Sequence, residues 1–446
     1  MRTTLLALLL CLPACTVDGT GDPDLSAADD GGPGPDAGGP DGAPSPGDAA
    51  PGTDTGTPTT ADGGATDTGT APEDGGTKPV TGEKKVIAYF AEWAVYGRNF
   101  HVPDVDGSLV THLNYAFLNV TGGECAIGDS YAALDKAYPG DTWDAGVLRG
   151  SFHQLQLLKA KHPKLRVLLS IGGWTWSGGF SDAAATDASR TKLAKSCAAI
   201  MNKYGFDGLD VDWEYPGGGG LAAGKPEDTQ NFTKLLAAFR AELGAGKLLS
   251  IAAPAGPAMI KNLELAKIHG YLDSINVMSY DFHGAWEKTT GHNSPLFRSA
   301  GDPSPSGWDT DAAVKAYLDG GVPAAKIVLG GAFYGRGWSG VGATGNGLYQ
   351  PATGASPGTY EAGVLDFHDL VANYVPTYKR YWDPVAKAPW LYDAAKQIMI
   401  SYDDAESLSV RGKYIVDRGL GGMMIWELSS DDKAHTLGKA VWASLH

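Results

Sequence analysis

The sequence predicts an α/β fold, a (β/α)8 TIM barrel that occupies residues 83–446. Two observations predict this fold class. After Lys84, short runs of apolar, β-branched and aromatic residues alternate with amphipathic stretches, which is typical of βα units and a parallel sheet. Eight of the short runs fall within about 360 residues, the number and length that favour a closed barrel.

The expected elements follow one another along the chain. The strand-like runs are short and rich in β-branched or aromatic residues, whereas the helix-like stretches repeat apolar residues every three or four positions. The expected strands cover 86–90, 113–118, 167–171, 208–213, 248–252, 275–280, 327–333 and 423–426. The clearest expected helices cover 148–161, 189–204, 229–243, 309–318 and 404–418.

Residues 337–396 depart from this alternation. They lie between the seventh strand and its helix and are rich in Gly, Tyr and Trp. The connections that follow barrel strands form the rim at their carboxyl ends. We therefore expect a small α+β insertion subdomain on that rim.

The first fifteen residues predict an export signal. Met1-Arg2 precedes an apolar run at 5–12, and Leu12-Pro13-Ala14 leads to Cys15. One positive charge, a short apolar run and a small residue before the cut are typical of a cleaved signal. Because the segment resembles a bacterial lipobox, we expect lipidation of Cys15 and a lipoprotein at the bacterial cell surface or outer membrane. Pro13 is unusual at its position, which keeps ordinary secretion as the alternative.

Residues 16–82 predict a disordered tether. Asp, Gly, Pro, Thr and Ala dominate, and large apolar side chains are almost absent, so burial cannot offset the entropy of ordering this segment. Thirteen acids and one lysine lie here, which accounts for most of the net charge of −16. Since no basic stripe occurs along the chain, we expect no nucleic-acid partner. Membrane contact is expected only through the lipid anchor.

The fourth strand-like run ends in a cluster of acids. The sequence FDGLDVDWEYP at 206–216 places Asp207, Asp210, Asp212 and Glu214 within eight residues. Side chains alternate between the faces of a strand, so the last three acids share one face, opposite an apolar face. Clustered buried carboxylates repel one another and resist desolvation, which favours a chemical role for them. We expect Asp207 only to support the barrel.

Polar and aromatic residues also follow the other strands. The carboxyl ends of barrel strands form one rim, so these residues should converge on the acids. Acids beside aromatic rings suit a carbohydrate, because the rings stack on sugar faces and the acids act on glycosidic oxygens. The residues concerned are Tyr89, the segment SIGGW at 170–174, the segment MSYD at 278–281, Tyr334, Arg336, Trp426 and Glu427.

Several motifs in the same order resemble glycoside hydrolase family 18, the chitinases. DGLDVDWEYP resembles the DxxDxDxE signature of that family, SIGGW its third-strand motif, MSYDFHGAW its sixth and YGRGW its seventh. YFAEWAVYGRNF, YWDPVAKAPWLY and SYDDAES extend the resemblance to about residues 85–446, and it is greatest to bacterial chitinases with an α+β insertion. The resemblance implies retaining hydrolysis of β-1,4 N-acetylglucosamine linkages in chitin and chitooligosaccharides.

The resemblance also implies roles for individual residues. Glu214 would act as general acid and then as base, and the acetamido oxygen of the substrate would attack to form an oxazolinium intermediate. Asp212 would orient the acetamido N–H, Asp210 would share a proton with Asp212, and Tyr280 would hold the acetamido oxygen. The implied substrate-binding residues are Tyr89, Trp93, Trp174, Met278, Asp281, Trp286, Tyr334, Arg336 and Trp426, the last as the floor beneath the reacting sugar.

Two other functions stay open. A chitin-binding lectin would keep the cleft without catalysis, although such lectins typically replace the acid found here as Glu214. An endo-β-N-acetylglucosaminidase would use the same acid and the same acetamido chemistry on other glycans that contain N-acetylglucosamine.

The sequence gives no indication of a cofactor or a metal. His283 and His292 lack the spacing of metal ligands. We expect a monomer. Cys197 lies among apolar residues at helical spacing and Cys125 lies in a Gly-Gly-Glu loop, so we do not predict a disulfide between them.

Overall fold

The computed structural model describes residues 82–446. The predicted export signal at 1–15, the lipidation of Cys15, and the predicted tether at 16–82 except for its last residue lie outside the described residues. Within residues 82–446, every helix is too short or too polar to cross a bilayer.

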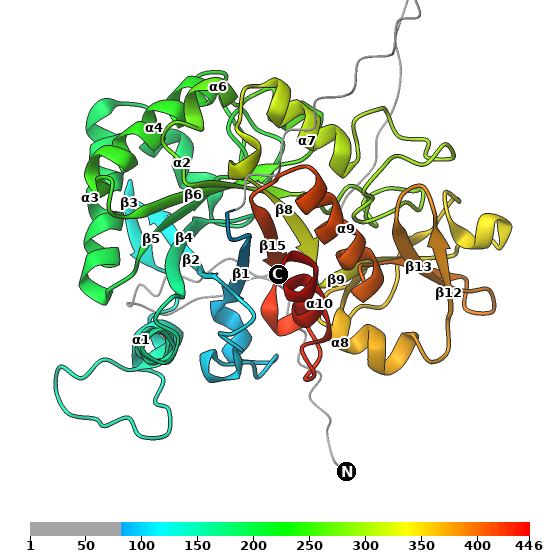
Figure 1. The fold of residues 1–446 in the computed structure, drawn as a ribbon, viewed down its shortest axis with the longest axis horizontal. Helices are drawn as coiled ribbons and strands as arrows, with labels where there is room; N and C mark the ends of the chain where they lie inside the picture. Colours follow the sequence, from blue (N-terminus) through cyan, green and yellow to red (C-terminus); the bar gives the residue numbers. More distant parts are fainter. Residues whose placement is uncertain (1–81) are drawn as a thin grey trace, which may run out of the picture. The chain divides into compact units, whose positions relative to one another are not determined.

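Within the described chain, eight parallel strands close into a barrel (Figure 1), as the sequence predicts. Their order is β1-β15-β8-β7-β6-β5-β4-β2, and the pairing of β1 with β2 closes the ring. The short strand β3 (Glu124–Ile127) forms an antiparallel hairpin with β2. The barrel strands are β1 (Lys85–Ala91), β2 (His112–Thr121), β4 (Arg166–Gly172), β5 (Gly208–Asp212), β6 (Leu248–Pro254), β7 (Ser274–Met278), β8 (Ile327–Ala332) and β15 (Gly422–Trp426).

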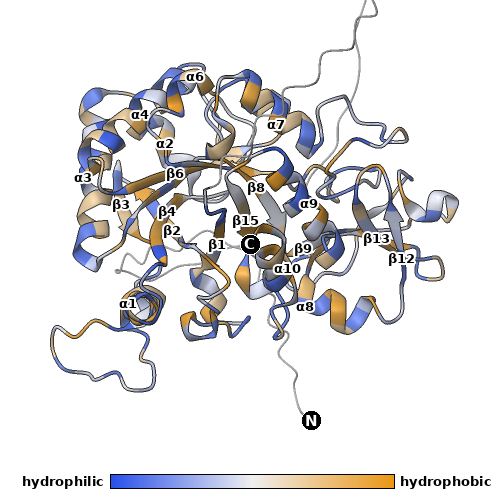
Figure 2. Cartoon of the chain, in the orientation of Figure 1, coloured by the Kyte–Doolittle hydropathy of each residue, from blue (hydrophilic) through white to orange (hydrophobic). Residues whose placement is uncertain are grey.

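Amphipathic helices surround the strands, and the five predicted helices are all present. Thr186, Asp309 and Asp404 begin three of them by accepting hydrogen bonds from first-turn N–H groups. Figure 2 shows mixed hydrophilic and hydrophobic residues along these helices, as expected for elements with one face on the barrel. The main helices are α1 (Gly150–Lys161), α3 (Asp187–Tyr204), α4 (Asp228–Leu243), α7 (Thr310–Asp319), α9 (Ala405–Asp417) and α10 (Thr436–Leu445); between β6 and β7 lie only the short α5 (Pro257–Ile260) and α6 (Leu265–Ile268).

A second, antiparallel sheet lies between β8 and α9, and we call it the insertion sheet. It runs from Tyr334 to Ser401, so it begins earlier and ends later than the expected 337–396. The reason is that Tyr334 and Arg336 already pair with β11, and Arg336 also pairs with Ser401. In Figure 1 this sheet lies beside the barrel. Its strands are β9 (Tyr334–Ser339), β10 (Gly354–Ala355), β11 (Val364–Asp366), β12 (Lys379–Asp383), β13 (Ala388–Asp393) and β14 (Ile398–Ser401).

The apolar face of β5 packs outward against helices. Leu209 and Val211 are fully buried, and the ring of Trp213 stacks on Phe180 at a centroid distance of 5.3 Å. The same ring meets Phe232 of α4 edge-on at 5.6 Å. Burying a side chain of this size contributes roughly 1.5–3 kcal/mol. A register slip by one residue would turn these side chains into the polar interior of the barrel and place the acids under the helices, so this face fixes the direction in which the acids point.

Cys125 and Cys197 form a disulfide, which the sequence analysis did not predict. Their Cα atoms lie 5.0 Å apart. Cys125 lies on β3 and Cys197 on α3, and the N–H of Cys125 donates to Ser196 Oγ at 2.9 Å. The two cysteines are 72 residues apart in sequence. Only the folding of the β2–β3 hairpin onto α3 brings them together, and local sequence patterns do not reveal that contact.

Loss of this disulfide is expected to destabilise the protein. A cross-link that closes a loop of 72 residues contributes about 4 kcal/mol to the free energy of unfolding in the chain-entropy treatment. The Cys125→Ser/Cys197→Ser variant should therefore unfold at lower urea concentration than the oxidised wild type, as followed by circular dichroism. Reductant should lower the midpoint of the wild type and leave the variant unchanged. Equal midpoints for the two proteins without reductant would contradict the cross-link.

Candidate active site

Asp210 lies inside the barrel, where four other strands supply hydrogen-bond donors to its carboxylate. Complete burial raises the pKa of Asp210, and these hydrogen bonds oppose that increase. The donors are Tyr89 Oη at 2.7 Å, Ser170 Oγ at 2.8 Å, Ser250 Oγ at 2.6 Å and Asn276 Nδ2 at 3.2 Å.

Asp212 lies next on the same face of β5 and has a different environment. Its side chain is buried, and its Oδ1 has no hydrogen-bond partner among residues 82–446. Burial raises the pKa of Asp212 well above its ordinary value, and the charges of Glu214 and Asp210 raise it further. Carboxyl groups this close titrate as a coupled set. The unpartnered oxygen can accept a hydrogen bond from a bound molecule without first giving up one from the protein.

Glu214 leaves β5 at the strand exit and is 8% exposed. Burial raises the pKa of Glu214 to about 7; a hydrogen bond with Tyr215 opposes the increase, and the charge of Asp281 adds to it. A carboxyl group with this pKa holds its proton at mildly acidic pH and exchanges it near neutrality. This is the property of a general acid–base catalyst.

Ser177 fixes the backbone at this exit and was not singled out from the sequence. Its Oγ accepts a hydrogen bond from the N–H of Glu214 at 2.8 Å. The same hydroxyl lies 2.8 Å from the carbonyl of Gly173 and 3.1 Å from that of Asp212. The loop after β4 therefore satisfies the N–H group of Glu214, two residues beyond the end of β5, which holds Glu214 in place.

A second polar group follows β7. The Oδ1 of Asp281 accepts hydrogen bonds from Tyr334 Oη and Arg336 Nε, both at 2.7 Å, and its Oδ2 accepts one from Arg336 Nη2 at 2.7 Å. Tyr280, one residue earlier, is 8% exposed, and its only hydroxyl contact is Met424 Sδ at 3.6 Å among the described residues. Burial raises the pKa of Tyr280 well above its usual range, and the neighbouring Tyr334 raises it further. Its O–H therefore stays a donor for a ligand.

Aromatic rings form a continuous floor around Trp426. Its ring stacks on Phe117 at 5.7 Å and lies 5.3 Å from Tyr89 and 6.3 Å from Trp93, measured between ring centroids. Phe117 comes from β2 and was not predicted to belong to the site. Flat rings of this kind suit the apolar faces of ring-shaped polar ligands.

Three further tryptophans stay exposed on the side of the molecule expected to hold ligand. Trp93, Trp174 and Trp286 are 41%, 48% and 60% exposed, which is high for such large rings. Arg336 lies over the ring of Trp286, with its Cζ 5.0 Å from the centroid. This cation–π contact joins Trp286 to the group around Asp281.

Tyr89 and Asp207 lie outside the exposed part of the site, whereas Met278 is partly buried. Tyr89 is 1% exposed and uses its hydroxyl on Asp210, so it lies beneath the acids. Met278 ends β7 and packs against the same cluster of barrel residues. Asp207 accepts a hydrogen bond from the N–H of Val167 and forms an ion pair with the Nζ of Lys159, both at 2.8 Å. This is the supporting position that the sequence suggests.

Two of the four residues missed in the sequence share one signal. Ser250 and Asn276 are single polar residues within otherwise apolar strands, LLSIAAP and SINVM. A buried polar side chain requires a hydrogen-bond partner, so such a residue in a barrel strand points to a polar interior. Ser177 and Phe117 offer no comparable signal because their roles depend on contacts with other strands.

The chemistry of the group follows from these positions. Glu214 can supply a proton near neutral pH, Asp212 Oδ1 has no partner among the described residues and can accept a hydrogen bond, and the Tyr280 hydroxyl can donate one. The ring of Trp426 is available as a flat floor. Such an arrangement can protonate a leaving oxygen while it holds an amide-bearing ring. Among residues 82–446, no group of three or more His, Cys, Asp or Glu side chains is arranged to hold a metal ion.

A family model, related sequences and a solved structure all match this chain to the same family of proteins. The family described as "Glycosyl hydrolases family 18" matches residues 85–431. Chitinase A1 of Niallia circulans is 45% identical over 395 residues, which cover 78% of this chain and 56% of that protein. Endochitinase 1 of Metarhizium robertsii is 41% identical over 355 residues, or 77% of this chain and 80% of that protein. The solved structure of chitinase ChiA74 from Bacillus thuringiensis aligns with a TM-score of 0.77 and 39% identity over 82% of this chain and 70% of that one.

Replacement of Glu214 is expected to stabilise the protein above neutral pH. Its pKa rises from 4.5 to about 7 on folding, so the folded state binds this proton more tightly than the unfolded state does. The favourable contribution of this bound proton to the free energy of unfolding is complete below pH 4.5 and is lost as pH rises to 7. Above pH 7 the ionised group disfavours folding by on the order of 3 kcal/mol relative to a neutral side chain. Glu214→Gln should therefore have a higher Tm than the wild type at pH 8 and a smaller advantage at pH 5.

The matched control is Glu242→Gln on the exposed face of α4, which should show no such dependence. Thermal unfolding at pH 5 and pH 8 measures the difference. Parallel Tm–pH curves for the wild type and Glu214→Gln would show that Glu214 ionises normally.

Proposed function

This chain belongs to glycosyl hydrolase family 18, and from that premise we propose that it hydrolyses β-1,4 N-acetylglucosamine linkages in chitin and chitooligosaccharides. The observation that supports this proposal most is the pair formed by Glu214, whose pKa is about 7, and Asp212, whose buried Oδ1 has no protein partner among the described residues. A proton donor and a free acceptor on one strand match the needs of a sugar that bears an acetamido group.

The proposed mechanism uses the substrate's own acetamido group as nucleophile. Glu214 donates its proton to the glycosidic oxygen as the bond from that oxygen to C1 breaks. The acetamido carbonyl oxygen then bonds to C1, which gives a cyclic oxazolinium ion and leaves Glu214 as a carboxylate. This carboxylate takes a proton from water, whose oxygen attacks C1 and opens the ring. Two inversions at C1 give a product with retained β configuration.

Asp212 and Tyr280 orient the acetamido group in this proposal. Asp212 Oδ1 accepts a hydrogen bond from the acetamido N–H and stabilises the positive charge that develops on the oxazolinium ring. The Tyr280 hydroxyl donates to the acetamido oxygen. Holding the nucleophile near C1 makes its attack intramolecular, and such orientation can lower the barrier by several kcal/mol.

Asp210 supports Asp212 from within the barrel. The four donors around Asp210 stabilise its ionised form, whereas Asp212 lacks such donors. Movement of one proton between the two carboxyl groups lets Asp212 change its charge as the intermediate forms and decays. The rings around Trp426 provide the floor for the reacting sugar, and Trp93, Trp174 and Trp286 provide platforms for its neighbours.

An endo-β-N-acetylglucosaminidase acting on other glycans is the second candidate, because it would use the same acid and the same acetamido group. A chitin-binding lectin is less favoured, since Glu214 is present and its pKa is about 7. The test below separates these functions.

Hydrolysis by the full-length protein tests the proposed function. Chitin hexasaccharide should be cleaved to shorter oligosaccharides that are initially in the β-anomeric form, as measured by proton NMR during the first minutes of reaction. Initial α-anomers would contradict the substrate-assisted mechanism. Binding without cleavage would favour a lectin or a different glycan as substrate.

In the same assay, Glu214→Gln should lower kcat by at least about 10²–10⁴-fold, the usual contribution of a positioned acid–base group. Asp212→Asn should also be strongly slowed, because the amide no longer stabilises the positive charge. Glu242→Gln is the control and should retain wild-type kcat.

For the N-terminal region, we propose that a lipid on Cys15 holds the enzyme at a bacterial surface, where residues 16–82 serve as a tether. Metabolic labelling with an alkyne analogue of palmitate should mark the wild-type protein and fail to mark Cys15→Ala. Label that persists in Cys15→Ala, or a wild type without label, would reject the anchor.

A further inference from the structure

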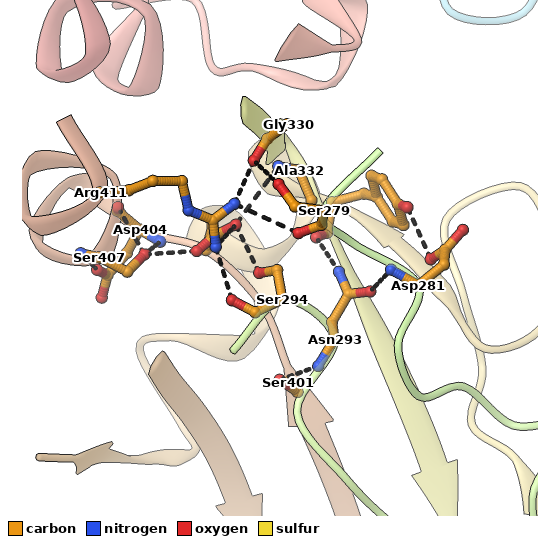
Figure 3. A network of polar contacts seen from close by, with 12 residues as sticks. Ser279, Asp281, Asn293, Ser294, Gly330, Ala332, Ser401, Asp404, Ser407 and Arg411 are labelled. Carbon is orange, nitrogen blue, oxygen red and sulfur yellow. Dashed lines mark hydrogen bonds and ion pairs between the residues drawn. The ribbon is translucent and has the colours of Figure 1, made fainter. Parts of the chain in front are cut away.

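We propose that Asn293, a buried residue of the loop after β7, is a positioning residue that fixes the conformation of Asp281 and joins Asp281 to the insertion sheet. The inference rests on the proposed function only in taking Glu214 as the acid. Asn293 has no exposed surface and lies outside the motifs that the sequence analysis used. Figure 3 shows it between Asp281 and Ser401.

Asn293 forms hydrogen bonds with three segments of the chain. Its Oδ1 accepts from the N–H of Asp281 at 3.0 Å, and its carbonyl accepts from the N–H of Phe282 at 3.0 Å. Its own N–H donates to Ser401 Oγ at 2.8 Å on β14, and its Nδ2 donates to the carbonyl of Tyr334 at 3.4 Å on β9. The side chain of Asn293 therefore joins Asp281 to β9, and its backbone N–H joins the same loop to β14.

The backbone of Asp281 depends on this support. Its φ angle is +57°, a left-handed conformation that disfavours residues with a side chain. The hydrogen bond from its N–H to Asn293 holds this conformation. The carboxylate of Asp281 is meanwhile bound by Tyr334 and Arg336, so its backbone and its side chain are both attached to the insertion sheet.

The residue after Asn293 is anchored in the interior. Ser294 Oγ donates to Asp403 Oδ2 at 2.7 Å, and the carbonyl of Ser294 accepts from Arg411 Nη2 at 2.6 Å. Arg411 lies on α9 and also donates to the carbonyl of Gly330 on β8 (Figure 3). A buried, charge-assisted network of this kind is rigid, and it leaves Asn293 little freedom to move.

The position of Asp281 matters because its charge reaches Glu214. Three groups face Glu214: Asp212 on β5, Tyr215 at the strand exit, and Asp281 on the loop after β7. Of these, Asp281 raises the pKa of Glu214 by charge repulsion. If Asp281 moved away, the pKa of Glu214 would fall, and the acid would lose its proton at lower pH.

The test is Asn293→Ala in the full-length protein, with Ser401→Ala as matched control. The control removes the acceptor of the Asn293 N–H and leaves the contact between Asn293 Oδ1 and Asp281 intact. For Asn293→Ala we expect kcat/KM on chitin hexasaccharide to fall about tenfold and the basic limb of its pH profile to move about half a unit lower. Ser401→Ala should leave that limb unchanged. A loss of activity with an unmoved limb would overturn the inference, because a merely structural role predicts that result.

A double-mutant cycle with Asp281→Asn shows whether Asn293 acts through Asp281. Asp281→Asn alone should lower the pKa of Glu214, and adding Asn293→Ala should produce no further shift. An equal shift from Asn293→Ala in both backgrounds overturns the inference. So does an unchanged Glu214 pKa in Asp281→Asn, which provides a test even if Asn293→Ala fails to fold.

The pKa of Glu214 can also be measured without substrate, from the pH dependence of the stability difference between each variant and its Glu214→Gln derivative. This separates the two proposals. If the wild type does not cleave chitin but Asn293→Ala lowers the Glu214 pKa, the proposed function fails and the positioning role stands. If the wild type cleaves chitin and the pKa is unchanged, the positioning role fails alone.

Discussion

The desolvation of three carboxyl groups, Asp210, Asp212 and Glu214, is the constraint on which the rest of the structure depends. All three are buried within five residues of β5 and its exit. Burial disfavours the charged form of each group, and their proximity adds repulsion. The barrel keeps them there because Leu209, Val211 and Trp213 on the opposite face are buried on the outer, helix-covered side of the barrel. Turning the strand over would move these apolar side chains into the polar barrel interior.

The three acids have different environments in the fold, and the different roles proposed for them follow from this. Asp210 receives hydrogen bonds from donors on four strands, which oppose the increase of its pKa on burial. Asp212 has an unpartnered oxygen, so its charge is the most expensive of the three in the absence of ligand. Glu214 lies between these extremes and titrates near neutrality. Three similar acids on one strand therefore differ in their proposed roles: Asp210 supports Asp212, Asp212 accepts a hydrogen bond and Glu214 donates a proton.

The insertion sheet belongs to the same electrostatic arrangement. It begins with Tyr334 and Arg336, which hold the carboxylate of Asp281, and Asp281 in turn acts on Glu214 by its charge. The sheet therefore does more than add a wall beside the barrel. The disulfide between β3 and α3 lies on a different part of the barrel, where it ties an edge hairpin to the helical layer.

The sequence by itself determined the eight barrel strands, five of the six main helices and the direction in which the acids of β5 point. These features repeat at short range, because strand alternation and helical periodicity depend on neighbouring residues. The motifs at the strand ends also indicated the family, since each motif is local. The structure describes these residues from 82 to 446, so the signal, the lipidation and most of the tether stay predictions.

Only the tertiary structure decided the contacts between distant segments. It brought Cys125 to Cys197 across 72 residues and placed the Ser177 hydroxyl against the N–H of Glu214. It also extended the insertion sheet beyond the expected bounds, to Tyr334 at its start and Ser401 at its end. It also placed Asn293, on the loop after β7, between Asp281 and Ser401 of β14. Each of these contacts depends on the closure of the barrel and the packing of the insertion sheet, and the energy of such packing is shared among residues that no local pattern in the sequence connects.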